Sequence, residues 1–171
     1  LARSKGPQQM TMEARQAPQS GGLDGLRRWQ HRELLRIGAG DLLGVADLSS
    51  VTRQLSHLAA ACIEACLESL AEALGLSAEG LAVIAQGKLG GAELNYSSDV
   101  DLLLIARDEP QRHIRLCGAL VQELERVTVE GFLYRVVLQL RPWGTAGPLV
   151  SSLAGYRRYL DASASLWERQ A

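Results

Sequence analysis

The sequence predicts an α+β fold, in which a small mixed sheet with flanking helices follows a helical lead-in. Two kinds of pattern support this prediction. Apolar residues recur at intervals of three and four positions over residues 49–74, the period of a helix with one buried face. Two short, continuous apolar runs, at residues 81–85 and 100–106, are typical of strands buried on both faces. With 171 residues, the chain is long enough to bury one core.

The segment before the sheet is expected to hold a tail and two helices. Residues 1–22 are rich in Gln, Gly, Ser and Pro, and we expect a disordered tail that adds nothing to stability. An amphipathic helix is expected over residues 23–37, ended by Gly38 and Gly40. Its arginines are interpreted as a solvated face rather than a binding patch, and they are Arg27, Arg28, Arg32 and Arg36.

The longest helix is expected over residues 49–74, with Ser49 or Ser50 as its N-cap and Gly75 at its end. A third strand is expected over residues 132–140, a helix packed on the sheet over 112–127, and a last helix from Ser152. We therefore divide the chain into a tail (1–22), a helical lead-in (23–80), a core (81–150) and the start of a truncated helical domain (151–171). Because the chain begins with Leu1, we interpret it as a fragment of a longer protein.

Composition argues against two classes of partner. The net charge is −1, so no global basic field favours nucleic acid. No apolar run approaches the roughly 20 residues that a membrane helix needs. The three cysteines, Cys62, Cys66 and Cys117, have no metal-ligand spacing and are interpreted as buried thiols, consistent with the cytoplasm.

The most informative segment is a glycine-rich turn, residues 87–91, followed by Asp99 and Asp101. Side chains alternate along a strand, so the two carboxylates are expected on one face, roughly 6–7 Å apart. Such a pair repels unless a cation lies between its members, and magnesium takes oxygen ligands of this kind and shares them with phosphates. Glycine-rich turns let backbone amides approach phosphate oxygens. The pattern favours a nucleotide or phosphoryl-transfer site; the alternative is an Asp pair that only caps backbone amides.

Residues 87–102, GKLGGAELNYSSDVDL, resemble the motif of the glutamine synthetase adenylyltransferase family, two-headed enzymes that add AMP to glutamine synthetase and remove it. Blocks at residues 26–44, 131–150 and 167–171 resemble the same family in the expected order. The resemblance implies a polymerase-β-like nucleotidyltransferase core, Mg²⁺ as cofactor and ATP or ADP as substrate or product. It also implies glutamine synthetase as a partner, with the PII signalling protein as a further one.

The resemblance also implies roles for single residues. Asp99 and Asp101 would be the catalytic, magnesium-binding pair. Gly90 and Gly91 would give the backbone approach to phosphate, with Ser97 and Ser98 as supporting donors. Arg135 and Arg141 would carry phosphate charge, although Arg135 equally suits a structural ion pair, and Lys88 equally suits a solvated turn.

Two positions depart from the family pattern. In that pattern a neighbouring strand supplies a third carboxylate, and this chain has Val137 there; it also has Gln139 in place of an arginine. Val137 is expected on the mostly polar face of the third strand, with Leu133, Arg135, Gln139 and Arg141, whereas Phe132 and Tyr134 face the core. Because a two-metal site needs its anionic ligands, we expect impaired catalysis.

The 94–98 and 141–150 runs favour the adenylyl-removing half, whereas Gln170 favours the adding half. The alternative is a non-catalytic domain that binds nucleotide or protein.

Overall fold

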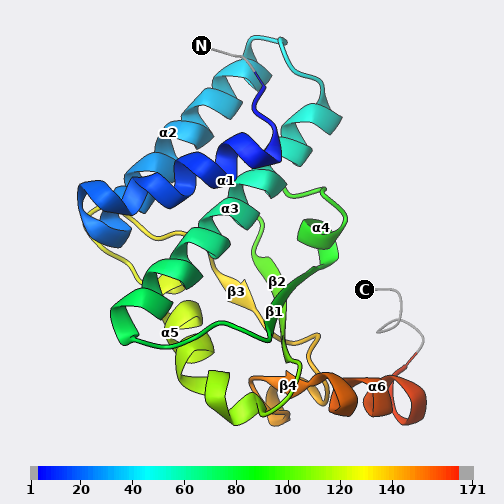
Figure 1. Cartoon of the computed structure of the whole chain (residues 1–171). Helices are drawn as coiled ribbons and strands as arrows, with labels where there is room; N and C mark the ends of the chain where they lie inside the picture. The colour runs from blue at the N-terminus through cyan, green and yellow to red at the C-terminus, as the bar shows by residue number, and fades with distance from the viewer. Residues whose placement is uncertain (1–3, 166–171) are drawn as a thin grey trace.

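The computed structural model describes residues 4–165, and its fold is α+β, as expected (Figure 1). Three helices form one layer: α1 (Pro7–Gln16), α2 (Gly22–Leu42) and α3 (Leu48–Leu74). The long helix α3 packs against α1, α2 and α5 (Ile114–Glu125), and a small sheet lies beside it. The core is therefore shared between the helical layer and the sheet, with buried residues of both in one cluster.

The cap residues of α3 set its ends. The Asp47 carboxylate accepts a hydrogen bond from the Ser50 backbone N–H at 2.8 Å, so the N-cap is Asp47 rather than Ser49 or Ser50. At the other end Gly75 adopts the left-handed conformation, with φ of +63°, which confirms it as the C-cap.

The helix α2 is longer than the sequence predicts, since it continues through Gly38 and Gly40 to Leu42. Glycine costs a helix interior about 1 kcal/mol relative to alanine. Here Gly40 is buried, and the Tyr96 ring lies 3.9 Å from the position that a Cβ of Gly38 would take. The two glycines therefore do not end the helix, contrary to the prediction.

The prediction of a disordered tail is wrong for residues 4–22, which form α1 and a 3-10 turn, η1 (Ala17–Ser20). Met10 and Ala14, one helical turn apart, are fully buried against the core. The Arg15 guanidinium bridges Glu64 and Glu68 on α3 at 2.8 and 2.7 Å. A low apolar content misleads here because a helix docked on a larger partner needs only a narrow apolar stripe.

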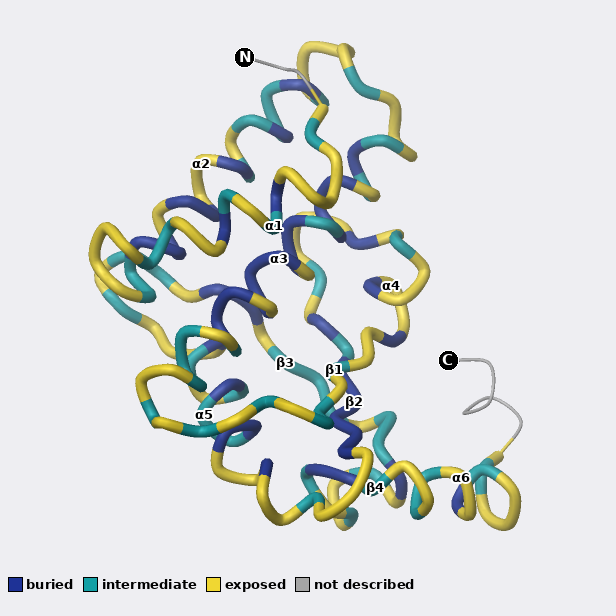
Figure 2. Tube along the Cα trace, in the orientation of Figure 1, coloured by how far each residue is buried: buried dark blue, intermediate teal, exposed yellow. Residues whose placement is uncertain are grey.

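The sheet is mixed and has four strands: β1 (Leu81–Gln86), β2 (Val100–Ala106), β3 (Val136–Val137) and β4 (Ser151–Ser152). The strand β2 is central; β1 pairs with it antiparallel, while β3 and β4 pair with it in parallel. Every residue of β2 except Asp101 is buried, as Figure 2 shows in dark blue. The remaining elements are α4 (Gly87–Gly90), η2 (Pro110–His113), η3 (Gly144–Ala146) and α6 (Leu153–Ala162).

Two expectations for the strands are corrected. The strand β1 lies at an edge of the sheet and is not buried on both faces, since Ile84 is 40% exposed. The third strand is only two residues long, and Phe132 is exposed while Leu133 is buried, the reverse of the prediction for these two residues, whereas Tyr134 is buried in the core as predicted. The cause is that the N–H groups of Leu133 and Tyr134 donate to the Leu124 carbonyl at the end of α5, so this part of the segment does not pair with β2 and the strand begins at Val136.

The last helix begins as predicted, because the Ser152 hydroxyl accepts a hydrogen bond from the Gly155 N–H at 3.1 Å. The block at 167–171 lies outside the described residues. The three cysteines are free thiols and buried, as predicted. No helix among residues 4–165 has the length and apolar character needed to cross a membrane.

Candidate active site

The two candidate carboxylates lie at the start of the central strand. Asp101 is the second residue of β2, and Asp99 immediately precedes the strand. Partial burial, together with the negative charge of Asp99, raises the pKa of the Asp101 carboxyl, and Lys88 opposes the shift. The pair is therefore close enough to repel, and the positive charge of Lys88 acts on Asp101 in the opposite sense.

The glycine-rich turn is a single helical turn, α4, that packs directly on Asp101. Gly87 has φ of +56°, and a Cβ there would lie 2.6 Å from the Asp101 Oδ2 atom. A Cβ on Gly90 would lie 2.8 Å from the Ala85 carbonyl oxygen, whereas one on Gly91 would meet nothing closer than 3.6 Å. Two of these glycines thus allow the turn to approach β1 and the carboxylate closely.

Arg135 forms an ion pair with Asp99, with the guanidinium Nε 2.6 Å from the carboxylate Oδ1. Both side chains are about half exposed, so solvent screens much of the attraction. The pair nevertheless places a cation directly on one of the two candidate metal ligands.

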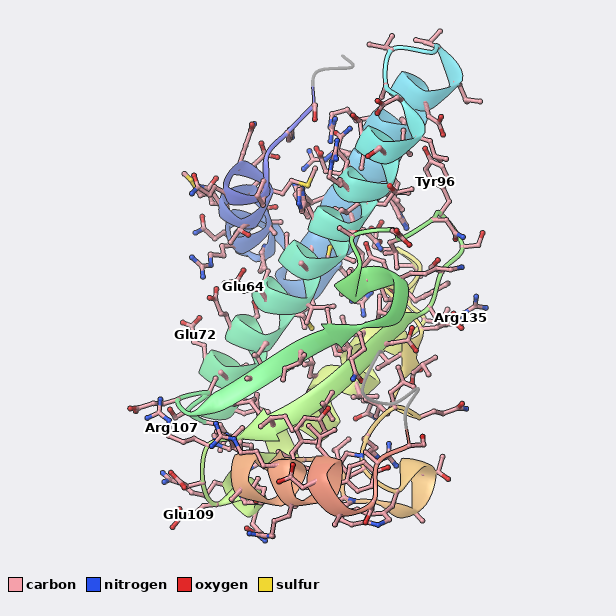
Figure 3. All side chains as sticks on the ribbon, turned by 90° about the vertical axis from the view of Figure 1, so that its right-hand side faces the viewer. Glu64, Glu72, Tyr96, Arg107, Glu109 and Arg135 are labelled. Carbon is pink, nitrogen blue, oxygen red and sulfur yellow. The ribbon has the colours of Figure 1, made fainter. Side chains whose placement is uncertain are left out.

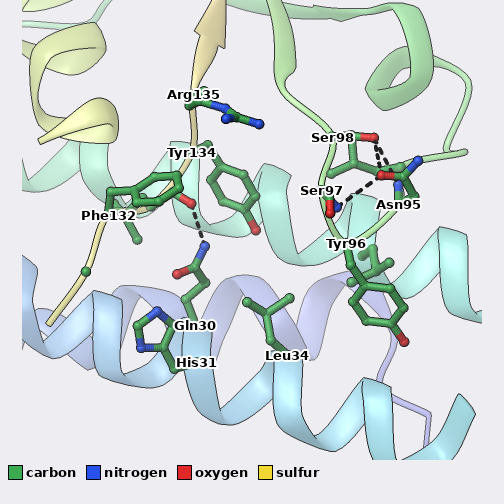
Figure 4. Close-up of a pocket in the computed structure, with 14 residues that line it drawn as sticks. Gln30, His31, Leu34, Asn95, Tyr96, Ser97, Ser98, Phe132, Tyr134 and Arg135 are labelled. Carbon is green, nitrogen blue, oxygen red and sulfur yellow. Dashed lines mark hydrogen bonds between the residues drawn. The ribbon is translucent and has the colours of Figure 1, made fainter. Parts of the chain in front are cut away.

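The two serines belong to a turn built around Asn95. The Asn95 carboxamide oxygen accepts from the Ser97 N–H at 3.1 Å and from the Ser98 hydroxyl at 2.8 Å (Figure 4). Next to them the Tyr96 hydroxyl donates to Asp41 at the end of α2, at 3.0 Å. The helical layer therefore holds this turn in place beside Asp99.

Arg141 has different partners from those expected of a phosphate ligand. Its guanidinium donates to the backbone carbonyls of Leu138, at 3.5 Å, and Thr145, at 3.1 Å. These bonds hold the turn that follows β3. In the structure Arg141 is thus directed to the backbone of its own turn.

Val137 is the register partner of Asp101 across the parallel β2–β3 pair. Register partners on adjacent strands have side chains on the same face, so residue 137 neighbours Asp101. A carboxylate at 137 would stand beside the Asp99–Asp101 pair. Among residues 4–165 no group of three His, Cys, Asp or Glu side chains is placed to hold a metal ion.

A cleft of about 220 Å³ opens between α2 and the chain segments 94–98 and 131–135, next to the Asp99–Arg135 pair (Figure 4). Ser97, Ser98 and Arg135 line it, which brings three of the sequence-predicted residues together. Gln30 and His31 of α2 also line it. The motif reasoning missed both; the only signal for them was their place in the 26–44 block. Tyr96 and Arg135 mark this end of the molecule in Figure 3, and Arg107 and Glu109 mark the opposite end.

The small mixed sheet with flanking helices, and the carboxylate pair at the start of its central strand, define a nucleotidyltransferase-like domain. Comparison with known proteins specifies the family. Residues 4–171 match the family model for glutamate-ammonia ligase adenylyltransferase. The chain belongs to this family, the glutamine synthetase adenylyltransferases.

The similar relatives are bifunctional glutamine synthetase adenylyltransferase/adenylyl-removing enzymes. Those of Methylococcus capsulatus and Shewanella loihica are each 38% identical over 85% of this chain, and that of Thioalkalivibrio sulfidiphilus is 40% identical over 85%. The chain spans only 17–18% of the length of these three relatives. The family is therefore shown, whereas the activity of a whole relative is not transferred by similarity alone.

Proposed function

We propose that this chain is a nucleotidyltransferase domain of an enzyme that adds AMP to glutamine synthetase and removes it. We assign it to the removing half, which uses phosphate to cleave an AMP–tyrosine bond and releases ADP. The family membership and the position of the Asp99–Asp101 pair support the proposal. The 94–98 and 141–150 runs favour the removing half over the adding half.

The two carboxylates fit one magnesium ion that is shared with nucleotide phosphates. Burial and, to a smaller extent, the negative charge of Asp99 raise the pKa of Asp101, and a divalent cation bound there would favour its ionised form. Bound there, Mg²⁺ would neutralise phosphate charge. The residues present do not supply the third carboxylate of a two-ion site, because Val137 occupies the position next to Asp101.

The other site residues have supporting roles in this proposal. The exposed backbone of Gly90 and Gly91 lies on the turn beside Asp101 and would approach phosphate, with Ser97 and Ser98 as further donors. Arg135 would exchange its bond with Asp99 for a phosphate oxygen. Lys88 and Arg141 are the further candidates for phosphate charge. The partners would be glutamine synthetase and the PII protein, in the cytoplasm.

We expect impaired catalysis because Val137, which has no carboxylate, is the register partner of Asp101. It also favours a second candidate function, a non-catalytic domain that binds nucleotide or glutamine synthetase without chemistry. The two candidates differ in whether restoring one carboxylate restores turnover.

The test is Val137→Asp in the full-length protein, measured as phosphate-dependent release of ADP from adenylylated glutamine synthetase. Completing the carboxylate set should raise turnover by on the order of 10²-fold, because a misplaced reacting group alone costs about that much. Val137→Asn, of nearly equal size and without charge, is the matched control and should stay slow. If the unsubstituted protein turns over as fast as Val137→Asp, the third carboxylate is not needed and this mechanism is wrong. If Val137→Asp still binds ADP but gains no turnover, the non-catalytic function is favoured.

A further inference from the structure

The cleft beside Asp99 has a mixed lining. At one end Figure 4 shows Arg135 and Ser98, which are charged and polar, and at the opposite end Gln30, His31 and Leu34 of α2. The lining also contains apolar and aromatic side chains, which are Leu34, Leu55, Leu94, Phe132, Leu133 and Tyr134. A ligand that matches this lining joins an anionic group to a flat, largely apolar ring. At about 220 Å³, the cleft is smaller than the roughly 300–1,000 Å³ that takes a whole drug-sized ligand, so it suits one ring system.

Gln30 gives this cleft a hydrogen-bonding preference. Its side chain is 2% exposed, and its amide N–H₂ donates to the Leu133 carbonyl at 2.7 Å (Figure 4). That bond fixes the amide orientation, because a carbonyl accepts only from the nitrogen. The amide oxygen, Oε1, is then left buried without a donor. A buried acceptor of this kind is unfavourable until a donor reaches it.

We propose that this cleft is the base-binding subsite of the nucleotide site, and that the 6-amino group of an adenine ring donates to Gln30 Oε1. The inference rests on the proposed function, which supplies an adenine nucleotide as ligand. The phosphates then lie toward Arg135 and the Asp99–Asp101 pair. The ring reaches Oε1 by displacing the side chain of Phe132, which is 42% exposed at the cleft rim.

The unsatisfied oxygen of Gln30 also distinguishes the two rings that take part in this reaction, adenine and the modified tyrosine. The adenine 6-amino group carries N–H donors. The tyrosine ring of an AMP–tyrosine ester has its only oxygen in the ester bond and offers no donor. Gln30 therefore favours adenine over the modified tyrosine as occupant of the cleft. It follows that α2, which supplies Gln30, His31 and Leu34, takes part in nucleotide recognition rather than only supporting the sheet.

The first test compares two ligands on the unsubstituted 171-residue chain by calorimetric titration. One ligand is ADP; the other is purine riboside 5′-diphosphate, which lacks only the 6-amino group. We expect the analogue to bind about tenfold more weakly, because a site built to bond an N–H discriminates strongly against its loss. Equal affinities would overturn the base subsite while leaving nucleotide binding intact. If neither ligand binds, the proposed function fails, and this inference fails with it.

The second test fills the cleft. Leu34→Trp places a large ring in the cleft and should weaken ADP binding at least tenfold, with pyrophosphate binding unchanged because it needs only the charged end. Leu35→Trp is the matched control, since Leu35 is 75% exposed and does not line the cleft. Thermal unfolding followed by circular dichroism checks that both variants fold; if Leu34→Trp does not, the two-ligand comparison decides. If Leu34→Trp binds ADP normally but no longer binds adenylylated glutamine synthetase, the cleft holds the partner's tyrosine and the adenine assignment is wrong.

Discussion

The helical layer and the Asp99–Asp101 end of β2 deal with charge in opposite ways. In the helical layer, Arg27 is 1% exposed, and its guanidinium bonds to the carboxylates of Glu123, at 2.8 Å, and Asp24, at 3.0 Å. It also donates to the backbone carbonyls of Glu123 and Arg126. At the start of β2, the carboxylates of Asp99 and Asp101 repel each other, and the ion pair between Asp99 and Arg135 is about half exposed to solvent.

This difference separates charges that hold the fold from charges that await a ligand. A buried, multiply bonded cation is matched by the structure around it, and its loss leaves partners unsatisfied. Repelling carboxylates at an open site are matched only when a cation or cationic group arrives. Substitutions in the two regions should therefore change stability in opposite directions.

The largest expected effect is the loss of Arg27. Arg27→Met keeps the side-chain stem but removes the charge, and among residues 4–165 this leaves Glu123 paired with the exposed Arg126 alone. We expect a loss of about 3 kcal/mol in the free energy of unfolding, measured with urea. Arg28→Met is the control, because the Arg28–Glu130 pair is partly exposed, with the side chains 45% and 33% exposed, and should cost less than about 1 kcal/mol. Equal losses in the two variants would contradict the distinction.

The next effect tests the docking of α1 on α2 and α3. Met10→Ala should destabilise the chain by about 2–3 kcal/mol, because the Met10 side chain is fully buried in the core. Met12→Ala, on the same helix but with Met12 62% exposed, should change stability by less than about 0.5 kcal/mol. The denaturant midpoints of the two variants decide the matter. A Met10→Ala midpoint equal to that of the unsubstituted chain would restore the original expectation of a tail that contributes nothing.

The sequence patterns predicted those parts of the fold whose residues act locally. The apolar spacing of 49–74 located α3, and the run at 100–106 located β2, because each element buries a face that its own residues define. Gly75 and Ser152 acted as caps for the same reason. Elements that depend on distant partners were predicted less well. The stretch 132–140 has a strand pattern, yet bonds to the end of α5 leave only Val136–Val137 paired with β2.

The arginines of α2 show the same limit. Spacing alone predicted one solvated face, but Arg27 is buried because α5 brings Glu123 to it across almost 100 residues of sequence. In the site, the motif located Asp99 and Asp101, and the structure adds that Lys88 influences Asp101 and that Arg135 bonds Asp99. Gln30 could not be predicted, because its unsatisfied oxygen is defined only once the Leu133 carbonyl is placed.

The smallest expected effect has the opposite sign and comes from Asp101. Partial burial and the charge of Asp99 raise its pKa in the folded state above the unfolded value, which is about 3.9 for Asp. The relevant pH window lies between the unfolded and the folded pKa of Asp101. As pH rises through this window, the unfolded chain loses the proton first, so stability falls until the folded carboxyl has also ionised. Below the window both states are protonated, and above it the cost remains at its full value. Asp101→Asn avoids this cost and should therefore be more stable than the unsubstituted chain at neutral pH, by less than about 1 kcal/mol because the site is partly solvated.

Two measurements check this prediction. Urea unfolding of both proteins from pH 3 to pH 7 should show the advantage of Asp101→Asn growing across the window and then staying constant. Asp99→Asn separates the two causes: it should lower the pKa of Asp101, followed by NMR of the carboxyl carbon, without returning it to the ordinary value, because burial is the larger cause. If Asp101→Asn is instead less stable at neutral pH, the Asp101 carboxylate holds the fold as Arg27 does. The contrast between the two regions would then fail.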